Sequence, residues 1–63
     1  MMKYAPVFTQ IIGPEGEIGY IKTNYVVTVQ EAEKGQLIIL TMLGNTITSY
    51  ESIESFMGKL VNE

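Results

Sequence analysis

The chain has 63 residues and a net charge of −3, from seven glutamates against four lysines, and it contains no cysteine, histidine, arginine or aspartate. The lack of cysteine and histidine excludes disulfides, zinc–thiolate centres and the usual general base at neutral pH. The four lysines are few and scattered and suit a phosphate backbone poorly, so we expect no nucleic-acid partner. We also expect no cofactor.

The composition, 46% hydrophobic and 17% charged, is typical of a folded globular protein, and we expect a single domain over residues 1–63. A chain of this size buries only about 60% of the surface that its unfolded form exposes. Self-association is therefore an expected supplement to a thin core. The longest aliphatic run, residues 37–40, is too short to span a bilayer, and the opening residues lack a signal peptide's apolar stretch. We expect a cytoplasmic protein without membrane contact.

The first half of the chain predicts a hairpin and a long strand. Residues 4–12 are rich in aromatic and β-branched residues and stop at Gly13-Pro14-Glu15-Gly16, a sequence typical of a turn. The chain is expected to return over residues 18–23. Asn24 then marks a bulge or bend before residues 25–30, whose β-branched content makes them the clearest strand.

The turn Glu33-Lys34-Gly35 predicts the register of the next strand. Residues 37–43 are apolar on both sides, which indicates a central strand covered on both faces. In this register Ala32 faces Gln36, and the pairs that follow on one face of the sheet are Val29 with Ile39, Val27 with Thr41 and Tyr25 with Leu43.

The opposite face of this sheet has no cover that the sequence identifies, because one helix covers only one face. Exposed apolar faces of this kind mark interaction sites. The alternative is that the sheet curls into a small barrel and buries both faces. Tyrosine is also enriched at binding hot spots, although strand propensity explains the tyrosines equally well. The candidate interface residues are Val26, Ile38, Leu40 and Met42 on this face, together with Tyr4, Tyr20 and Tyr50.

The last third of the chain predicts a helix. Gly44-Asn45 suits a two-residue turn, and residues 46–48 extend the sheet by one short strand if they pair. Capping signals at Thr48 and Ser49 place the helix start near Ser49 or Tyr50. The apolar helical stripe consists of Ile53, Phe56, Met57, Leu60 and Val61. The predicted fold class is α+β, a small antiparallel β-meander of three to four strands with one C-terminal α-helix packed on one face.

No motif points to catalysis or to metal binding. The glycine-rich residues 13–19 are not followed by a helix and contain two glutamates, so they do not predict a phosphate-binding loop. The glutamate pairs at 15 and 17, 31 and 33, and 51 and 54 are expected at turns or on the polar side of the helix, where they lack the burial that a functional carboxylate site needs. We expect no catalytic, cofactor-binding or metal site and no enzymatic activity.

Our first hypothesis is a non-catalytic interaction module that forms a homodimer or higher oligomer through its apolar sheet face. The alternative is an acidic inhibitor or modulator of a larger host enzyme. In size and acidity the chain resembles the small accessory proteins of phages and other mobile elements, and no motif supports that resemblance. A third hypothesis, a pocket formed between subunits with a reactive lysine, ranks below both, and a small-molecule ligand is not expected.

Overall fold

The computed structural model describes residues 7–60. The strands are all antiparallel and form a two-stranded sheet, β1–β2, and a three-stranded sheet in the order β3–β4–β5. The elements are β1 (Phe8–Ile12), β2 (Ile18–Lys22), the 3-10 turn η1 (Thr23–Tyr25), β3 (Val26–Glu33), β4 (Gln36–Thr41), β5 (Thr46–Ser49) and α1 (Ile53–Leu60). The predicted α+β class, with antiparallel strands and a C-terminal helix, is confirmed.

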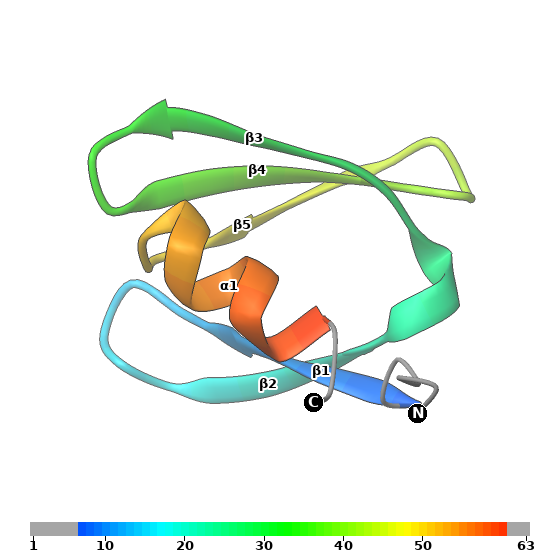
Figure 1. The fold of residues 1–63 in the computed structure, drawn as a ribbon, viewed down its shortest axis with the longest axis horizontal. Helices are drawn as coiled ribbons and strands as arrows, with labels where there is room; N and C mark the ends of the chain where they lie inside the picture. Colours follow the sequence, from blue (N-terminus) through cyan, green and yellow to red (C-terminus); the bar gives the residue numbers. More distant parts are fainter. Residues whose placement is uncertain (1–6, 61–63) are drawn as a thin grey trace.

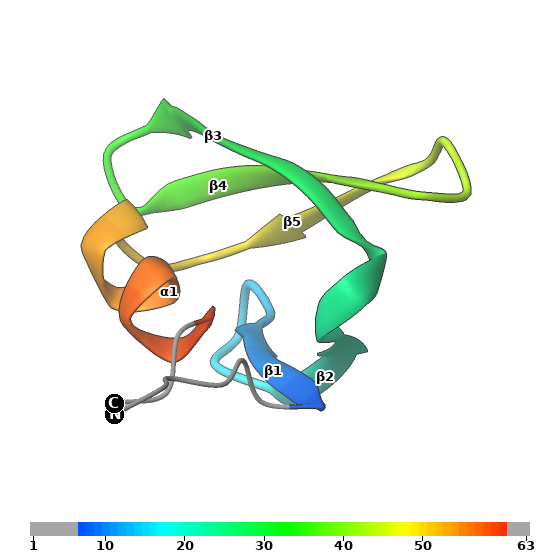
Figure 2. The ribbon, with the colours of Figure 1, turned by 45° about the vertical axis from the view of Figure 1, so that its right-hand side comes forward.

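The two sheets face each other across the core, and α1 lies between them (Figure 1). The turned view shows the β1–β2 hairpin below the three-stranded sheet, with η1 connecting the two (Figure 2). The meander of the prediction is thus β3–β4–β5, and the first hairpin stands apart from it. The buried apolar residues come from both sheets and the helix: Ile21, Leu37, Ile39 and Phe56.

The separation of the two sheets depends on a bend at Asn24, as predicted. Asn24 is the middle residue of η1, which interrupts the β-rich stretch between β2 and β3. A backbone hydrogen bond from Thr23 N–H to the Val7 carbonyl (2.9 Å) and a hydroxyl–hydroxyl bond between Thr23 and buried Thr9 (2.7 Å) fix the bend against β1. The chain therefore leaves the hairpin in a new direction and starts a second sheet.

The register between β3 and β4 agrees with the prediction at its centre and differs at both ends. Val29 lies opposite Ile39 as predicted. Irregularities between Val26 and Thr28, and between Glu31 and Glu33, each add a residue to β3. The three other predicted pairs are therefore wrong, since Val26 faces Thr41 and Glu33 faces Gln36.

The first irregularity also changes which side of the sheet Val26 occupies. An extra residue in one strand shifts the alternation of its side chains. Val26 consequently packs against the buried core cluster, while Val27 is 54% exposed. The predicted position of Val26 on the second sheet face is wrong for this reason.

The turn from β4 to β5 spans Met42–Gly44, so the predicted two-residue turn at Gly44-Asn45 is wrong. The Thr41 carbonyl accepts a hydrogen bond from Gly44 N–H, and the Asn45 carbonyl accepts one from Thr41 N–H, both at 3.0 Å. Gly44 has a φ of +89°, which only glycine adopts without strain. The predicted short strand after the turn is confirmed as β5.

Helix α1 begins at Ile53, later than the predicted start near Ser49 or Tyr50. Its N-cap is Ser52, whose hydroxyl accepts a hydrogen bond from Ser55 N–H at 3.1 Å. Ser49 instead ends β5, where it pairs with Leu37. Along the predicted stripe Phe56 is fully buried, Ile53 and Leu60 pack on the core, Met57 is half-exposed, and Val61 lies outside the described residues.

We predict that Phe56→Ala lowers the free energy of unfolding by about 3–5 kcal/mol, because it removes the largest fully buried side chain of the core. Urea denaturation followed by circular dichroism measures the change. Met57→Ala on the same helix is the matched control, because Met57 is 45% exposed, and it should cost less than about 1 kcal/mol. Equal losses for the two variants would contradict this account of the core.

Candidate interaction surfaces

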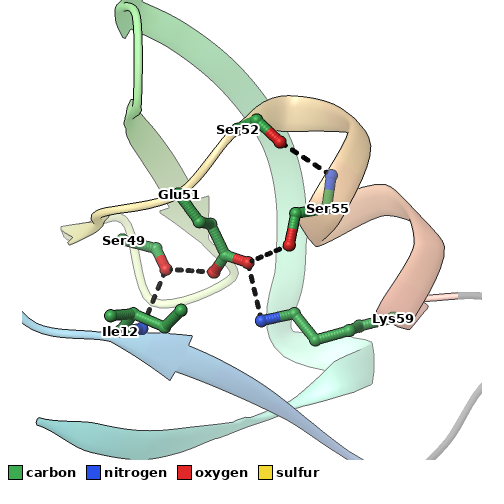
Figure 3. Close-up of polar contacts among 6 residues, drawn as sticks. All are labelled: Ile12, Ser49, Glu51, Ser52, Ser55 and Lys59. Atoms are coloured by element: carbon green, nitrogen blue, oxygen red, sulfur yellow. Dashed lines mark hydrogen bonds and ion pairs between the residues drawn. The ribbon is translucent and has the colours of Figure 1, made fainter. Parts of the chain in front are cut away.

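A buried polar cluster around Glu51 connects the first hairpin, the second sheet and the helix (Figure 3). The Ser49 hydroxyl accepts a hydrogen bond from Ile12 N–H at 3.0 Å and donates one to the Glu51 carboxylate at 2.5 Å. The second carboxylate oxygen accepts a hydrogen bond from the Ser55 hydroxyl at 3.1 Å and lies 2.7 Å from Lys59 Nζ. One carboxylate therefore contacts β5 and α1 directly and reaches β1 through Ser49.

The expectation that Glu51 lies unburied on the polar side of the helix is wrong, because Glu51 precedes α1 and is buried. The electrostatics of this cluster favour a charged Glu51. Its side chain is only 4% exposed, and burial alone would raise the carboxyl pKa. Hydrogen bonds from Lys59, Ser49 and Ser55, together with the positive charge of Lys59, outweigh burial and hold the pKa of Glu51 below its ordinary value. With every buried polar atom of the described side chains hydrogen-bonded, we assign the cluster a role in stability.

The lowered pKa predicts a loss of stability in acid. A carboxyl with a depressed folded-state pKa stabilises the fold above its unfolded pKa of about 4.3, and this contribution disappears as pH falls through the folded value. Glu51→Gln should cost on the order of 1–3 kcal/mol at pH 7, because it removes the charge-assisted bonds. It should also flatten the acid limb of a plot of unfolding free energy against pH.

Exposed Glu54 on the same helix offers the matched control, as Glu54→Gln. That variant should leave the acid limb unchanged. An acid limb that persists in full in Glu51→Gln would show that Glu51 does not carry this dependence.

The residues predicted to form one apolar sheet face do not come together as predicted. Ile38 and Leu40 point to the outer side of the three-stranded sheet and are half-buried, beside Thr28, Thr46 and Thr48. Val26 points inward, and Met42 lies in the β4–β5 turn, 64% exposed. The barrel alternative is also wrong for residues 7–60, because Ile38 and Leu40 are not buried.

The predicted tyrosines are distributed over separate parts of the surface. Tyr20 is 64% exposed on β2, and Tyr50 follows β5 and is 38% exposed. Tyr50 N–H donates a hydrogen bond to the Ile12 carbonyl at 2.8 Å, so its backbone has a structural role. Tyr4 lies outside the described residues.

The outer face of the β1–β2 hairpin carries exposed apolar side chains. The inner side carries buried Thr9 and Ile21, and alternation along both strands sends the intervening side chains outward. On that side Phe8 is 58% exposed and Ile18 is 54% exposed. We define the hairpin face as three cross-strand pairs, Phe8 with Lys22, Gln10 with Tyr20 and Ile12 with Ile18.

Sequence reasoning selected Tyr20 from this face and missed Phe8 and Ile18. Residues 8–12 carry apolar side chains on both sides of the strand, which was a signal for an unpartnered face. The longer apolar run of residues 37–43 is the stronger signal in the sequence. In the structure β4 lies between β3 and β5, and its apolar side chains are buried or half-buried.

Two other apolar features lie near β3. At the corner of the molecule Tyr25 and Val27 are exposed, as are Met42 and Leu43 in the β4–β5 turn, where Met42 N–H donates to the Tyr25 carbonyl at 2.8 Å. An open groove of about 380 Å³ between β3 and α1 is lined by Thr23, Val26, Val27, Val29, Met57 and Leu60. The β3 edge beside this groove carries two bulges and exposed glutamates, features that discourage pairing with another strand.

The acidic side chains gather at the other end of β3. An open hollow of about 490 Å³ is lined by Glu31, Ala32, Glu33, Lys34, Ser52 and Glu54. Among residues 7–60 no group of three carboxylates is arranged to hold a metal ion, and no helix there has the length and apolar character needed to cross a membrane.

Comparison with known proteins gives no relative: no family model, no curated protein and no solved structure matches this chain.

Proposed function

We propose that this chain is a small, non-catalytic protein-interaction module of the cytoplasm that binds its partner through the hairpin face. The observation that supports this most strongly is the exposure of Phe8, Ile18 and Tyr20, each above one half, on one side of a two-stranded sheet. Contiguous apolar surface of this kind is uncommon on monomers and often functional. The aromatic residues are of the types enriched at binding hot spots.

The hairpin face suits protein binding better than the outer face of the three-stranded sheet. On the latter, Ile38 and Leu40 are half-buried, and threonines of the flanking strands lie beside them. On the hairpin face, Phe8 and Tyr20 are exposed. The polar side chains that β1 and β2 also direct outward are Gln10 and Lys22. Burial of exposed aromatic side chains provides most of the binding free energy at interfaces.

Site-specific crosslinking tests this proposal. A photoreactive phenylalanine analogue in place of Tyr20 should form a covalent product with a protein partner when the chain is expressed in its native cells. The same analogue in place of Gln30, an exposed residue on the outer side of β3, is the control and should give no discrete product. Because both positions lie in exposed strands, they differ chiefly in the surface they occupy.

The products are detected as mass shifts of the tagged chain and identified by mass spectrometry. A discrete product at position 20 alone supports binding through the hairpin face. Equal labelling at both positions, or none at either, would contradict it.

A second candidate function, an acidic modulator of a larger enzyme, is favoured by the hollow at the β3–β4 turn. Glu31, Glu33 and Glu54 line this hollow with one lysine, Lys34. Figure 1 shows the β1–β2 loop, which contains Glu15 and Glu17, at the same end of the molecule. Surface charge of one sign steers association with a basic groove.

A basic partner bound at this end should dissociate as salt rises, because ions screen exposed charges. Glu31→Gln with Glu33→Gln should weaken binding at low salt and reduce its salt dependence. The measurement compares the native-cell partners that stay bound to the tagged chain at about 50 mM and at about 500 mM salt. Screening of exposed charges is weak at the first concentration and strong at the second. Retention unaffected by both salt and the double substitution would exclude the acidic end as the binding surface.

A further inference from the structure

We propose that the space between β3 and α1 is a second binding site, which takes an extended segment of a partner protein with apolar residues in one half and lysine or arginine in the other. None of the residues that line this space belongs to the hairpin face, so the inference goes beyond the proposed function. It is supported by the order of the side chains along β3 and α1, first apolar and then acidic.

Two hollows follow one another along the same pair of elements. β3 runs from η1 to the β3–β4 turn, and α1 begins at the end of the molecule where that turn lies and runs the opposite way (Figure 1). The groove of about 380 Å³ lies between the first part of β3 and the second half of α1. The hollow of about 490 Å³ lies between the last part of β3, its turn and the start of α1. Together they follow the eight residues of β3, a length of about 25 Å at about 3.3 Å per residue.

The half nearer η1 is apolar. Besides Thr23 its lining consists of five apolar side chains: Val26, Val27, Val29, Met57 and Leu60. Val26, Val29 and Leu60 pack on the core cluster, so this part of the lining is fixed. Val27 is 54% exposed and Met57 is 45% exposed, and both therefore have surface that a ligand can bury. Apolar side chains of a ligand would gain free energy by removing that surface from water.

The half nearer the β3–β4 turn is acidic. Its charged side chains are three carboxylates and one ammonium, which sum to −2: Glu31, Glu33, Glu54 and Lys34. All four residues are exposed. Carboxylates of one sign on both sides of a hollow attract a cation and repel an anion. This half therefore suits the ammonium or guanidinium groups of a ligand.

Charge complementarity thus names the occupant. A wholly apolar segment leaves the acidic half uncompensated, and a wholly basic one leaves the apolar half in water. A segment that carries acidic residues beside its apolar ones is repelled, which gives the site its specificity. A second copy of this chain does not supply the required segment, because its four lysines, at positions 3, 22, 34 and 59, are too far apart to place two in one short stretch. The occupant is therefore a segment of a different protein.

The shape of the site fits a stretch of polypeptide. Both hollows are open to solvent, whereas small-molecule sites enclose most of their ligand. An extended segment of about eight residues has the same length as β3. The two bulges of β3 disfavour backbone pairing along its edge, so recognition falls to the side chains of the segment.

Fluorescence anisotropy with a synthetic peptide tests the site. The probe is a labelled peptide of about eight residues, with leucines in one half and lysines in the other, and it should bind the purified chain. A peptide of the same composition in which leucine and lysine alternate should bind at least about threefold more weakly, because it does not match the two halves.

Charge reversal tests the acidic half. Glu31→Lys with Glu33→Lys should raise the Kd of the leucine–lysine peptide at least about tenfold at low salt, and should allow binding of a leucine–glutamate peptide that the wild-type chain rejects. The matched control is Glu15→Lys with Glu17→Lys, which makes the same change in net charge at two exposed glutamates of the same spacing in the β1–β2 loop. It should change the Kd of either peptide by less than about threefold.

A substitution of Val27 tests the apolar half. Val27→Ser should raise the Kd of the leucine–lysine peptide about three- to tenfold, because it removes apolar surface from the groove. Ile18→Ser is the control, because Ile18 on the hairpin face has the same exposed fraction, 54%, and it should leave the Kd unchanged. This pair also separates the site from an acidic surface that binds by charge alone, since such binding would not respond to Val27→Ser.

The inference would be overturned by a leucine–lysine peptide that fails to bind at millimolar concentration, or that binds no better than the alternating one. Loss of affinity in Ile18→Ser but not in Val27→Ser would also overturn it, because the peptide would then lie on the hairpin face. The crosslinking test at Tyr20 is independent of these outcomes, since Tyr20 does not line either hollow. Failure of this site and failure of the proposed function are therefore told apart.

Discussion

The tertiary structure depends on holding a two-stranded hairpin against a three-stranded sheet that follows it in the chain. A hairpin of two short strands is marginally stable by itself. Here its inner side is fixed at one end by the Thr9–Thr23 bond at the bend, and at the other by Ile12, whose backbone pairs with Ser49 and Tyr50. The Glu51 carboxylate extends this second junction to the helix through Ser55 and Lys59.

The Glu51 cluster shows how so small a protein compensates for a thin core. The fully buried apolar side chains are few, and polar side chains at Thr9, Thr41, Ser49 and Glu51 are buried beside them. Burying polar groups is unfavourable unless each finds a partner. For Thr9, Ser49 and Glu51 the partners come from different elements, so the same hydrogen bonds that satisfy these groups also hold the elements together. A charged carboxylate in this position connects stability to pH.

The hairpin face follows from the same construction. A two-stranded sheet that turns one side toward the core must turn the other outward, and the helix, placed between the sheets, does not reach that outer side (Figure 2). In β1 both sides carry apolar residues, with Ile11 packed on the core and Phe8 exposed. The fold therefore uses one side of the hairpin for stability and leaves the other exposed.

The sequence by itself determined the elements whose signals are local. Turn residues located the first hairpin, Asn24 marked the bend, β-branched residues defined β3, an apolar run defined β4, and helical spacing identified α1. Its pattern also placed the central pair Val29 and Ile39 correctly, because the residue that the bulge between Glu31 and Glu33 adds to β3 offsets the shorter turn at Lys34-Gly35.

Only the tertiary structure decided which faces are covered. The bulge that turns Val26 inward, the use of Ser49 in β5 and the division of the strands into two sheets all depend on contacts between residues far apart in the chain. Alternation of apolar residues predicts that a strand has two sides, but it does not say what packs against each. For that physical reason the sequence pointed to a candidate surface on β4, whereas the structure exposes Phe8, Ile18 and Tyr20 on the outer side of the first hairpin.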